Sequence, residues 1–109
     1  MTEVFVKKEK EHVVSVISKG HAGFARRGKD IVCSAISVLM INTANSIKCF
    51  TEDAIEVESD KEKGEISILL PKEYSEKTDV LLKALLLGLS GIEEEYPKYF
   101  RLYTEEVLK

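Results

Sequence analysis

Hydrophobic and polar residues alternate along the first part of the chain with the two-residue period of β-strands. Thr2 to Lys7 places Val4 and Val6 on one face, and Val13 to Lys19 is rich in β-branched residues, so both segments are predicted to be strands. The polar stretch Lys8 to Glu11 lies between them. This pattern predicts a β-hairpin at the start of the chain.

A glycine-rich segment, Gly20 to Lys29, comes next and is predicted to be a flexible loop. Its glycines are Gly20, Gly23 and Gly28. Asp30 can cap a helix that begins at Ile31 and runs to about Lys48. This helix carries no charge as far as Ile47, but that stretch is at the short limit for crossing a membrane and contains serine and asparagine. We therefore expect a helix buried within the protein or partly at a subunit contact, and no membrane partner.

The second half of the chain predicts another hairpin, another helix and a last strand. The hairpin is expected from Ala54 to Ser59 and from Glu65 to Leu70, with a turn at Asp60 to Gly64. The helix is expected from Glu76 to about Glu95, because Ser75 can cap it and leucines recur on one side.

Pro97 blocks continuation of that helix, and Phe100 to Val107 alternates loosely as a strand does. The predicted order is therefore β-β-α-β-β-α-β. This order favours an α+β fold, a mixed, mainly antiparallel β-sheet packed with two helices.

Length and composition suit a single domain, predicted to span residues 1–109. With 44% hydrophobic and 32% charged residues, the chain has an ordinary globular balance and can build its own core. Its net charge of −3 argues against a general nucleic-acid binder, so no direct nucleic-acid binding is expected. The N-terminus lacks a signal-peptide pattern, and we expect both thiols, Cys33 and Cys49, to be free in the cytoplasm.

The stretch from Gly20 to Ser37 carries the residues of greatest chemical interest. It places His21 at the end of a predicted strand and Cys33 in the first turn of a predicted helix. A helix start favours a thiolate nucleophile, a nearby imidazole can take its proton, and N–H groups around Cys33 and Ser34 could hold an oxyanion. Spacing alone does not prove contact, because a single cysteine on an apolar helix is usually a small buried hydrophobe.

Asp30 and Ser37 are candidate supporting residues. Asp30 can cap the helix or, as a third catalytic group, orient His21. Capping is favoured, because a carboxylate beside Cys33 would oppose formation of the thiolate. Ser37 lies one helical turn after Cys33 on the same face, where it can hydrogen-bond near the thiol or simply allow close packing.

The same region admits two weaker interpretations. Gly23 to Lys29 fits the start of a phosphate-binding loop, but Asp30 stands where Ser or Thr should hold magnesium, and its charge would repel phosphate. Arg26, Arg27 and Lys29 make the loop basic, as a solvated surface or as a contact with a polar or anionic partner. Cysteine and histidine lack the paired spacing of zinc sites, so no metal and no cofactor is expected.

Taken together, these residues resemble the bacterial ribosomal-processing cysteine protease family, also called Prp. The resemblance rests on Gly20-His21-Ala22 and Asp30-Ile31-Val32-Cys33-Ser34-Ala35, together with Gly28 and Ser37. It spans nearly the whole chain and includes Gly88 and the segment Tyr96-Pro97-Lys98-Tyr99.

The resemblance implies removal of an N-terminal extension from large-subunit ribosomal protein number twenty-seven, after a short segment rich in apolar and aromatic residues. The family's catalytic pair falls on His21 and Cys33, and its supporting residues fall on Asp30 and Ser37. Members look like homodimers with a mobile loop over the site, which fits the three glycines. The alternatives are a non-enzymatic ribosome-associated module that binds through the basic loop, and a thiol hydrolase with another substrate.

Overall fold

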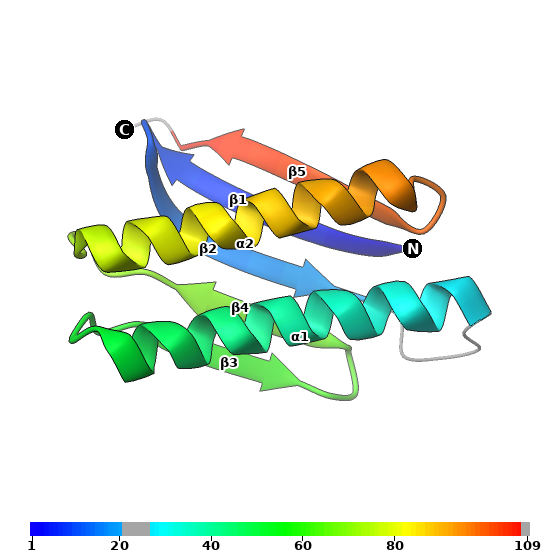
Figure 1. Cartoon of the computed structure of the whole chain (residues 1–109), viewed down its shortest axis with the longest axis horizontal. Coiled ribbons are helices and arrows are strands. Elements are labelled where there is room, and N and C mark those ends of the chain that lie inside the picture. Colours follow the sequence, from blue (N-terminus) through cyan, green and yellow to red (C-terminus); the bar gives the residue numbers. More distant parts are fainter. Residues whose placement is uncertain (21–26, 108–109) are drawn as a thin grey trace.

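The structure is a computed structural model that describes residues 1–20 and 27–107, without the side chains of residues 27–30. A five-stranded sheet forms one layer and two helices form the other (Figure 1). The elements are β1 (Thr2–Glu9), β2 (His12–Lys19), α1 (Arg27–Phe50), β3 (Glu56–Asp60), β4 (Glu65–Leu69), α2 (Glu76–Glu95) and β5 (Phe100–Glu106). The predicted order and the α+β class are confirmed.

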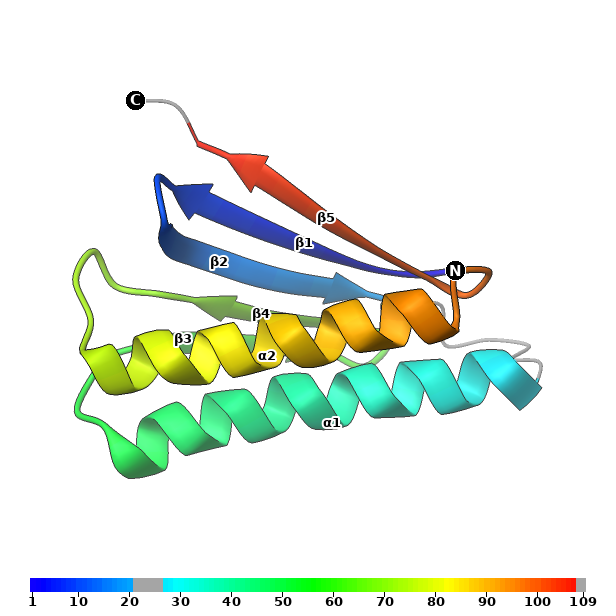
Figure 2. The ribbon, with the colours of Figure 1, turned by 45° about the horizontal axis from the view of Figure 1, so that its top comes forward.

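The strand order in the sheet is β3-β4-β2-β1-β5. The hairpins β1–β2 and β3–β4 and the pair β2–β4 are antiparallel. Among the hydrogen-bonded neighbours described, β1 and β5 are the parallel pair, so the sheet is mixed and mainly antiparallel as predicted. Both parallel crossovers contain a helix: α1 connects β2 to β3, and α2 connects β4 to β5. The two helices lie side by side on the same face of the sheet (Figure 2).

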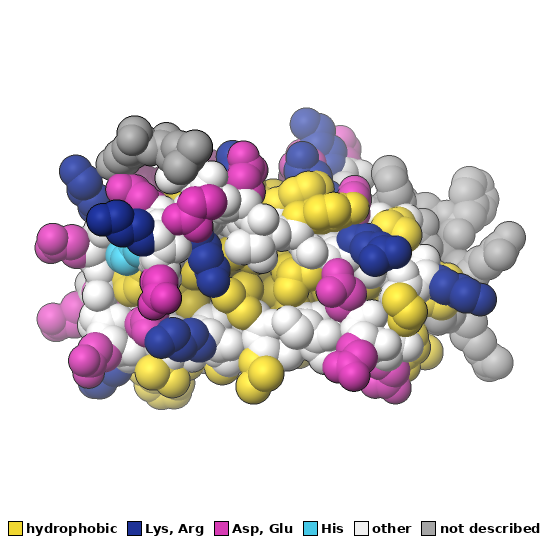
Figure 3. Space-filling view, turned by 90° about the horizontal axis from the view of Figure 1, so that it is seen from above, with side chains coloured by type: hydrophobic (Ala, Val, Ile, Leu, Met, Phe, Trp, Pro, Cys, Tyr) yellow, Lys and Arg dark blue, Asp and Glu magenta, His cyan; other side chains and the backbone are white. Residues whose placement is uncertain are grey.

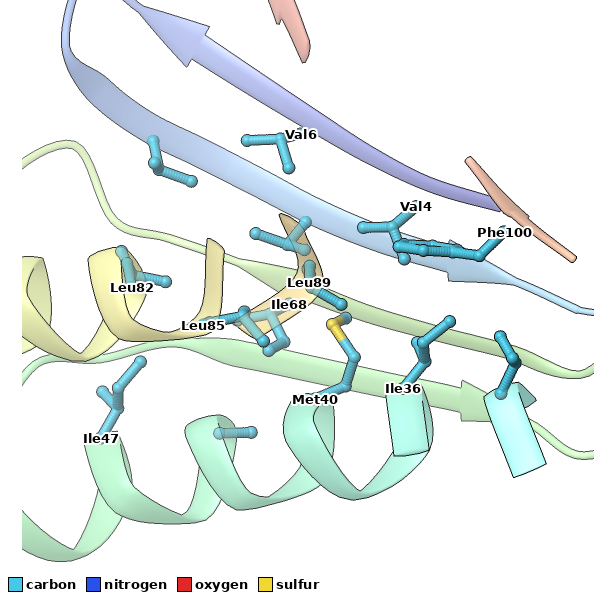
Figure 4. Close-up of a cluster of buried hydrophobic side chains, with 14 residues drawn as sticks. Val4, Val6, Ile36, Met40, Ile47, Ile68, Leu82, Leu85, Leu89 and Phe100 are labelled. Carbon is cyan, nitrogen blue, oxygen red and sulfur yellow. The ribbon is translucent and has the colours of Figure 1, made fainter. Parts of the chain in front are cut away.

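The core fills the space between the sheet and the helices (Figure 4). Alternation along β1 turns Val4 and Val6 toward the helices, and both are fully buried. The helices contribute buried side chains that recur at helical spacing and face the sheet. Phe100, at the start of β5, is also fully buried in this core. The fully buried helical side chains include Val32, Ile36, Met40, Ile47, Leu82, Leu85 and Leu89.

Helix α1 is long and apolar enough to cross a membrane by length and composition, over Ile31–Phe50. Its inner stripe, however, packs on the sheet and on α2, so removing it would open the core. The helices approach closely at Gly88, where an added Cβ would lie 3.1 Å from Cδ1 of Leu39. The packing is therefore that of the core helix expected from the sequence.

The start of α2 is held by a hydrogen-bonded cluster, which we call the Asp53 cluster: Thr51, Asp53, Ser75 and Thr78. Ser75 is the predicted N-cap, and its Oγ accepts from the N–H of Thr78. The Asp53 carboxylate accepts from the N–H of Ser75 at 3.1 Å, from its Oγ at 2.6 Å and from the Thr78 hydroxyl. The Ser75 and Thr78 hydroxyls, as donors to the charged form, lower the pKa of Asp53 below its ordinary value.

Helix α1 differs from the prediction at its start. It begins at Arg27, whereas Ile31 was expected, so the predicted loop ends earlier and the helix is one turn longer. Gly28 therefore lies inside the helix and does not belong to a loop. Asp30 is the fourth helical residue, so its prediction as the cap is wrong, because a cap precedes the first helical residue.

Charged side chains of both signs are interspersed over the face of the molecule seen from above (Figure 3). The described residues on that face therefore form no continuous basic surface of the kind that follows a nucleic-acid backbone.

Candidate active site

Cys33 lies beside the start of β1 and the residue that follows the end of β2. Its thiol is half-buried and free, on the flank of α1 beside the core stripe. Sγ lies 2.9 Å from the Oγ1 of Thr2, at the start of β1. The nucleophile candidate is therefore held by a side-chain contact and remains partly open to solvent.

Gly20 brings the chain that leads to His21 against the same sulfur. A Cβ added at Gly20 would lie 3.6 Å from the Cys33 Sγ and 3.5 Å from the Thr2 Oγ1. The Gly20 N–H donates to the carbonyl of Gly64 at 3.0 Å, which ties the end of β2 to the turn before β4. His21 itself lies outside the described residues, but the residue directly before it borders Cys33.

The turn between β3 and β4 has a defined geometry that presents this carbonyl. The Asp60 carboxylate accepts from the N–H groups of Glu62 and Lys63, at 3.0 and 3.1 Å. Gly64 follows with φ of 66°, a left-handed conformation that favours glycine. The predicted turn at Asp60 to Gly64 is confirmed, and its last residue bonds Gly20, which borders the Cys33 sulfur.

The second histidine, His12, is remote from this site. It begins β2, and a strand of that length places it roughly 25 Å from Gly20. Its ring stacks on Tyr74 with the centroids 4.1 Å apart. By its position along β2, His12 is therefore too far away to act on the Cys33 thiol.

Because α1 begins earlier than predicted, the N–H groups of Cys33 and Ser34 are not free to hold an oxyanion. Cys33 and Ser34 are the seventh and eighth helical residues, beyond the four whose N–H groups are free at a helix start. At these positions an α-helix uses each N–H to bond the carbonyl four residues earlier. The prediction that these two N–H groups hold an oxyanion is therefore wrong, and Cys33 lies in the second helical turn, past the first.

The structure describes some of the predicted supporting residues and leaves others outside the described part of the chain. Ser37 is half-buried one turn after Cys33, as predicted, and Ser34 is exposed. The side chain of Asp30 and all of Gly23 lie outside what the structure describes, so the proposed orientation of His21 by Asp30 stays a prediction. Among the described residues, no group of three His, Cys, Asp or Glu is placed to hold a metal ion.

A groove of about 280 Å³ lies along α1, beginning at Ser37, one helical turn after Cys33. Ser37 and Ile41, one and two turns after Cys33, form its helical wall, and Ile66 adds an apolar residue from β4. Its other side is the β3–β4 turn, including Gly64. The size approaches the lower end of ligand pockets, about 300 to 1,000 Å³, so the groove suits a short piece of a larger ligand.

Sequence reasoning missed Thr2 as part of the site. One signal was present, because Thr2 shares the parity of Val4 and Val6 and so faces the core side of β1. A hydroxyl turned toward a core needs a partner. Which partner it meets depends on the distant pairing of β1 with its neighbours, and no local pattern reveals that.

Comparison with known proteins gives consistent matches. A family model described as cysteine protease Prp matches residues 1–101. The ribosomal processing cysteine protease Prp of Staphylococcus aureus is 31% identical over 90 residues, which cover 83% of this chain and 85% of the relative.

Two crystal structures of the Staphylococcus aureus protease also match. The complex with a substrate peptide superposes with a TM-score of 0.90 and 28% identity, over 96% of this chain and 100% of that one. The complex with a covalently linked product peptide has a TM-score of 0.85 and 29% identity, with the same coverage.

Proposed function

The chain belongs to the cysteine protease Prp family, and we propose that it removes the N-terminal extension of the precursor of large-subunit ribosomal protein number twenty-seven. As a member of that family it is a ribosomal-processing cysteine protease. The finer assignment, to one precursor and to named catalytic residues, is supported by the relative with a bound substrate peptide and by the surroundings of Cys33.

In the proposed mechanism, Cys33 is the nucleophile and His21 is the general base and acid. The observation that carries this assignment is the position of Gly20, which borders the Cys33 sulfur directly before His21 in the chain. His21 takes the thiol proton, and the thiolate attacks the peptide carbonyl. His21 then protonates the leaving amine, water adds to the thioester with loss of a proton to His21, and the carboxylic acid and free thiol are released.

The groove beside Ser37 and Ile41 supports an extended substrate with apolar side chains. It starts one turn from Cys33 and has apolar residues from both α1 and β4. We propose that an apolar or aromatic residue of the extension occupies it, because burial of such a side chain supplies binding free energy without a charge partner. Ser37 then acts as part of the groove wall.

The proposed activity is tested with a peptide that spans the precursor cleavage site, analysed by mass spectrometry. We expect one cut by the wild-type protein and none by Cys33→Ala or His21→Ala. Cleavage that survives Cys33→Ala would refute the mechanism. If the protein cuts only a different peptide, it is a thiol hydrolase with another substrate. If it binds ribosomes and cuts no peptide, it is a non-enzymatic ribosome-associated module.

We also propose that the chain forms a homodimer in the cytoplasm. Ile31 and Val38 on the outward side of α1 are 55% and 65% exposed, and a second copy is a plausible cover for such apolar side chains. Two free cysteines are typical of a reducing compartment such as the cytoplasm. We expect the wild-type protein to sediment as a dimer and the Val38→Asp variant to dissociate into monomers. A wild-type protein that sediments as a monomer at micromolar concentration would contradict the dimer.

A further inference from the structure

We propose that the Thr2 hydroxyl is a built-in hydrogen-bond donor to the Cys33 thiolate, which fixes the position of the sulfur and increases the share of protein in the thiolate form. The inference rests on the proposed function only in that Cys33 is the nucleophile. Its basis is the 2.9 Å separation between Thr2 Oγ1 and Cys33 Sγ.

The polarity of this contact follows from the chemistry of the two groups. A hydroxyl has one proton to donate and two lone pairs that accept, whereas a thiolate can only accept. In the neutral form, either atom can donate to the other. Once the proton has left Cys33, the hydroxyl must be the donor, and a hydrogen bond to a charged acceptor is stronger than one between neutral groups.

The surroundings of Thr2 direct the hydroxyl toward the sulfur. Thr2 is only 3% exposed, so bulk water does not compete for its side chain. Its N–H is already used, because it donates to the carbonyl of Tyr99 at 2.9 Å. In the sheet it pairs with Phe100 of β5, and its branched side chain has restricted rotation about χ1. The donor is therefore in place before any substrate arrives.

This hydrogen bond acts on the free thiolate, before the sulfur attacks the substrate. The sulfur carries a full negative charge in the thiolate and none in the thioester, so the bond stabilises the free thiolate and weakens on attack. A thiolate stabilised in this way is more abundant at low pH but less reactive per molecule. Thr2 is thus expected to broaden the pH range of the enzyme at some cost in maximal rate.

The test is the rate of iodoacetamide alkylation of Cys33 against pH, measured on the full chain with Cys49→Ser so that one thiol is read. The test variant is Thr2→Val, which keeps the branched shape and removes the hydroxyl. Thr2→Ser keeps the hydroxyl. Thr43→Val removes a different buried hydroxyl, bonded to the carbonyl of Leu39 on the same helix, and serves as the remote control.

Thr2→Val is expected to move the pH midpoint of alkylation upward by about one unit, the size of one hydrogen bond to a charged group. The profiles should then cross, with the variant about threefold slower below the midpoint and about threefold faster well above it. Thr2→Ser and Thr43→Val should follow the parent. A purely structural role would change the rate alike at every pH, without a crossing.

A Thr2→Val profile that superposes on the parent, or a Thr2→Ser profile displaced as far as that of Thr2→Val, overturns the inference. If Thr2→Val fails to fold by circular dichroism, Thr2→Ala provides the same comparison. Peptide cleavage is scored separately on the wild type. A protein that leaves the precursor peptide intact but shows the crossing profiles refutes the proposed substrate alone, and normal cleavage with unmoved profiles refutes the role of Thr2 alone.

Discussion

Helix α1 carries a cysteine near each of its ends, and the surroundings of the two cysteines differ. Near its start, Cys33 is half-buried against Thr2 and Gly20, with a groove beside it. Near its end, Cys49 is exposed, and the neighbouring Asp53 cluster bonds the start of α2. The proposed nucleophile is thus positioned by one side-chain contact, whereas the polar groups of the Asp53 cluster bond one another and hold the start of α2.

The largest expected effect separates the two cysteines. Cys33→Ala should lower kcat/KM for the precursor peptide at least about 10⁴-fold, because removal of a nucleophile leaves only the effects of binding. Cys49→Ala should leave kcat/KM within about twofold of wild type, since its thiol lies at the other end of α1. Initial rates at low substrate concentration measure both. Comparable losses of kcat/KM in the two variants would show that the two cysteines do not differ in function.

A smaller loss is expected in the groove beside Cys33. Ile41→Asp should reduce kcat/KM about tenfold or more, because a carboxylate replaces an apolar wall. The matched control is Val80→Asp, the same kind of change at an exposed apolar residue of α2 that does not line the groove. Sedimentation should establish that both variants keep the wild-type assembly. Equal effects of the two changes on kcat/KM would remove the groove from the substrate path.

At the other end, the expected effect is on stability and not on catalysis. Ser75→Ala removes the N-cap of α2 and should lower the free energy of unfolding by about 1 kcal/mol, or the Tm by about 4 °C. Ser90→Ala, an exposed serine inside the same helix, is the control and should cost nothing. Urea unfolding measures both. A fall in kcat/KM for Ser75→Ala at a temperature where it is folded would contradict the separation of the two ends.

The smallest expected effect is on how the free energy of unfolding depends on pH, and it is confined to acid pH. Hydrogen bonds from Ser75 and Thr78 lower the pKa of Asp53 from its ordinary 3.8, so the folded chain binds this proton less tightly than the unfolded chain. The stabilisation is complete above that ordinary value and is lost as the pH falls through the lower pKa of the folded state. The stability difference between wild type and Asp53→Asn should therefore narrow on acidification. Urea unfolding between about pH 5 and pH 2 tests this, and a constant difference would exclude it.

Local signals predicted α2 to the residue, because they agree with one another. Ser75 caps the helix, leucines repeat on its buried side and Pro97 prevents its extension. The start of α1 was predicted too late for the opposite reason. The glycine-rich pattern predicts a loop that includes Gly28, because glycine costs about 1 kcal/mol in a helix. The helix nevertheless includes it, and this one turn changes which N–H groups are free near Cys33.

The site was predictable only in part. His21 and Cys33 were selected from a motif, and the structure adds that Gly20 borders the sulfur. The contact with Thr2 was not predictable, because it joins residues 31 positions apart through the sheet. The groove combines α1 with the β3–β4 turn, and so depends on a crossover whose packing no local sequence pattern specifies.

The parallel pairing of β1 with β5 has a consequence for when Thr2 is fixed beside Cys33 during synthesis of the chain. The β1–β2 hairpin and α1 emerge early, but Thr2 receives its backbone anchor from Tyr99, near the end of the chain. Domains assemble as the chain leaves the ribosome, and contacts between distant segments form last. A growing chain therefore carries Cys33 long before the strand that anchors Thr2 beside it is available.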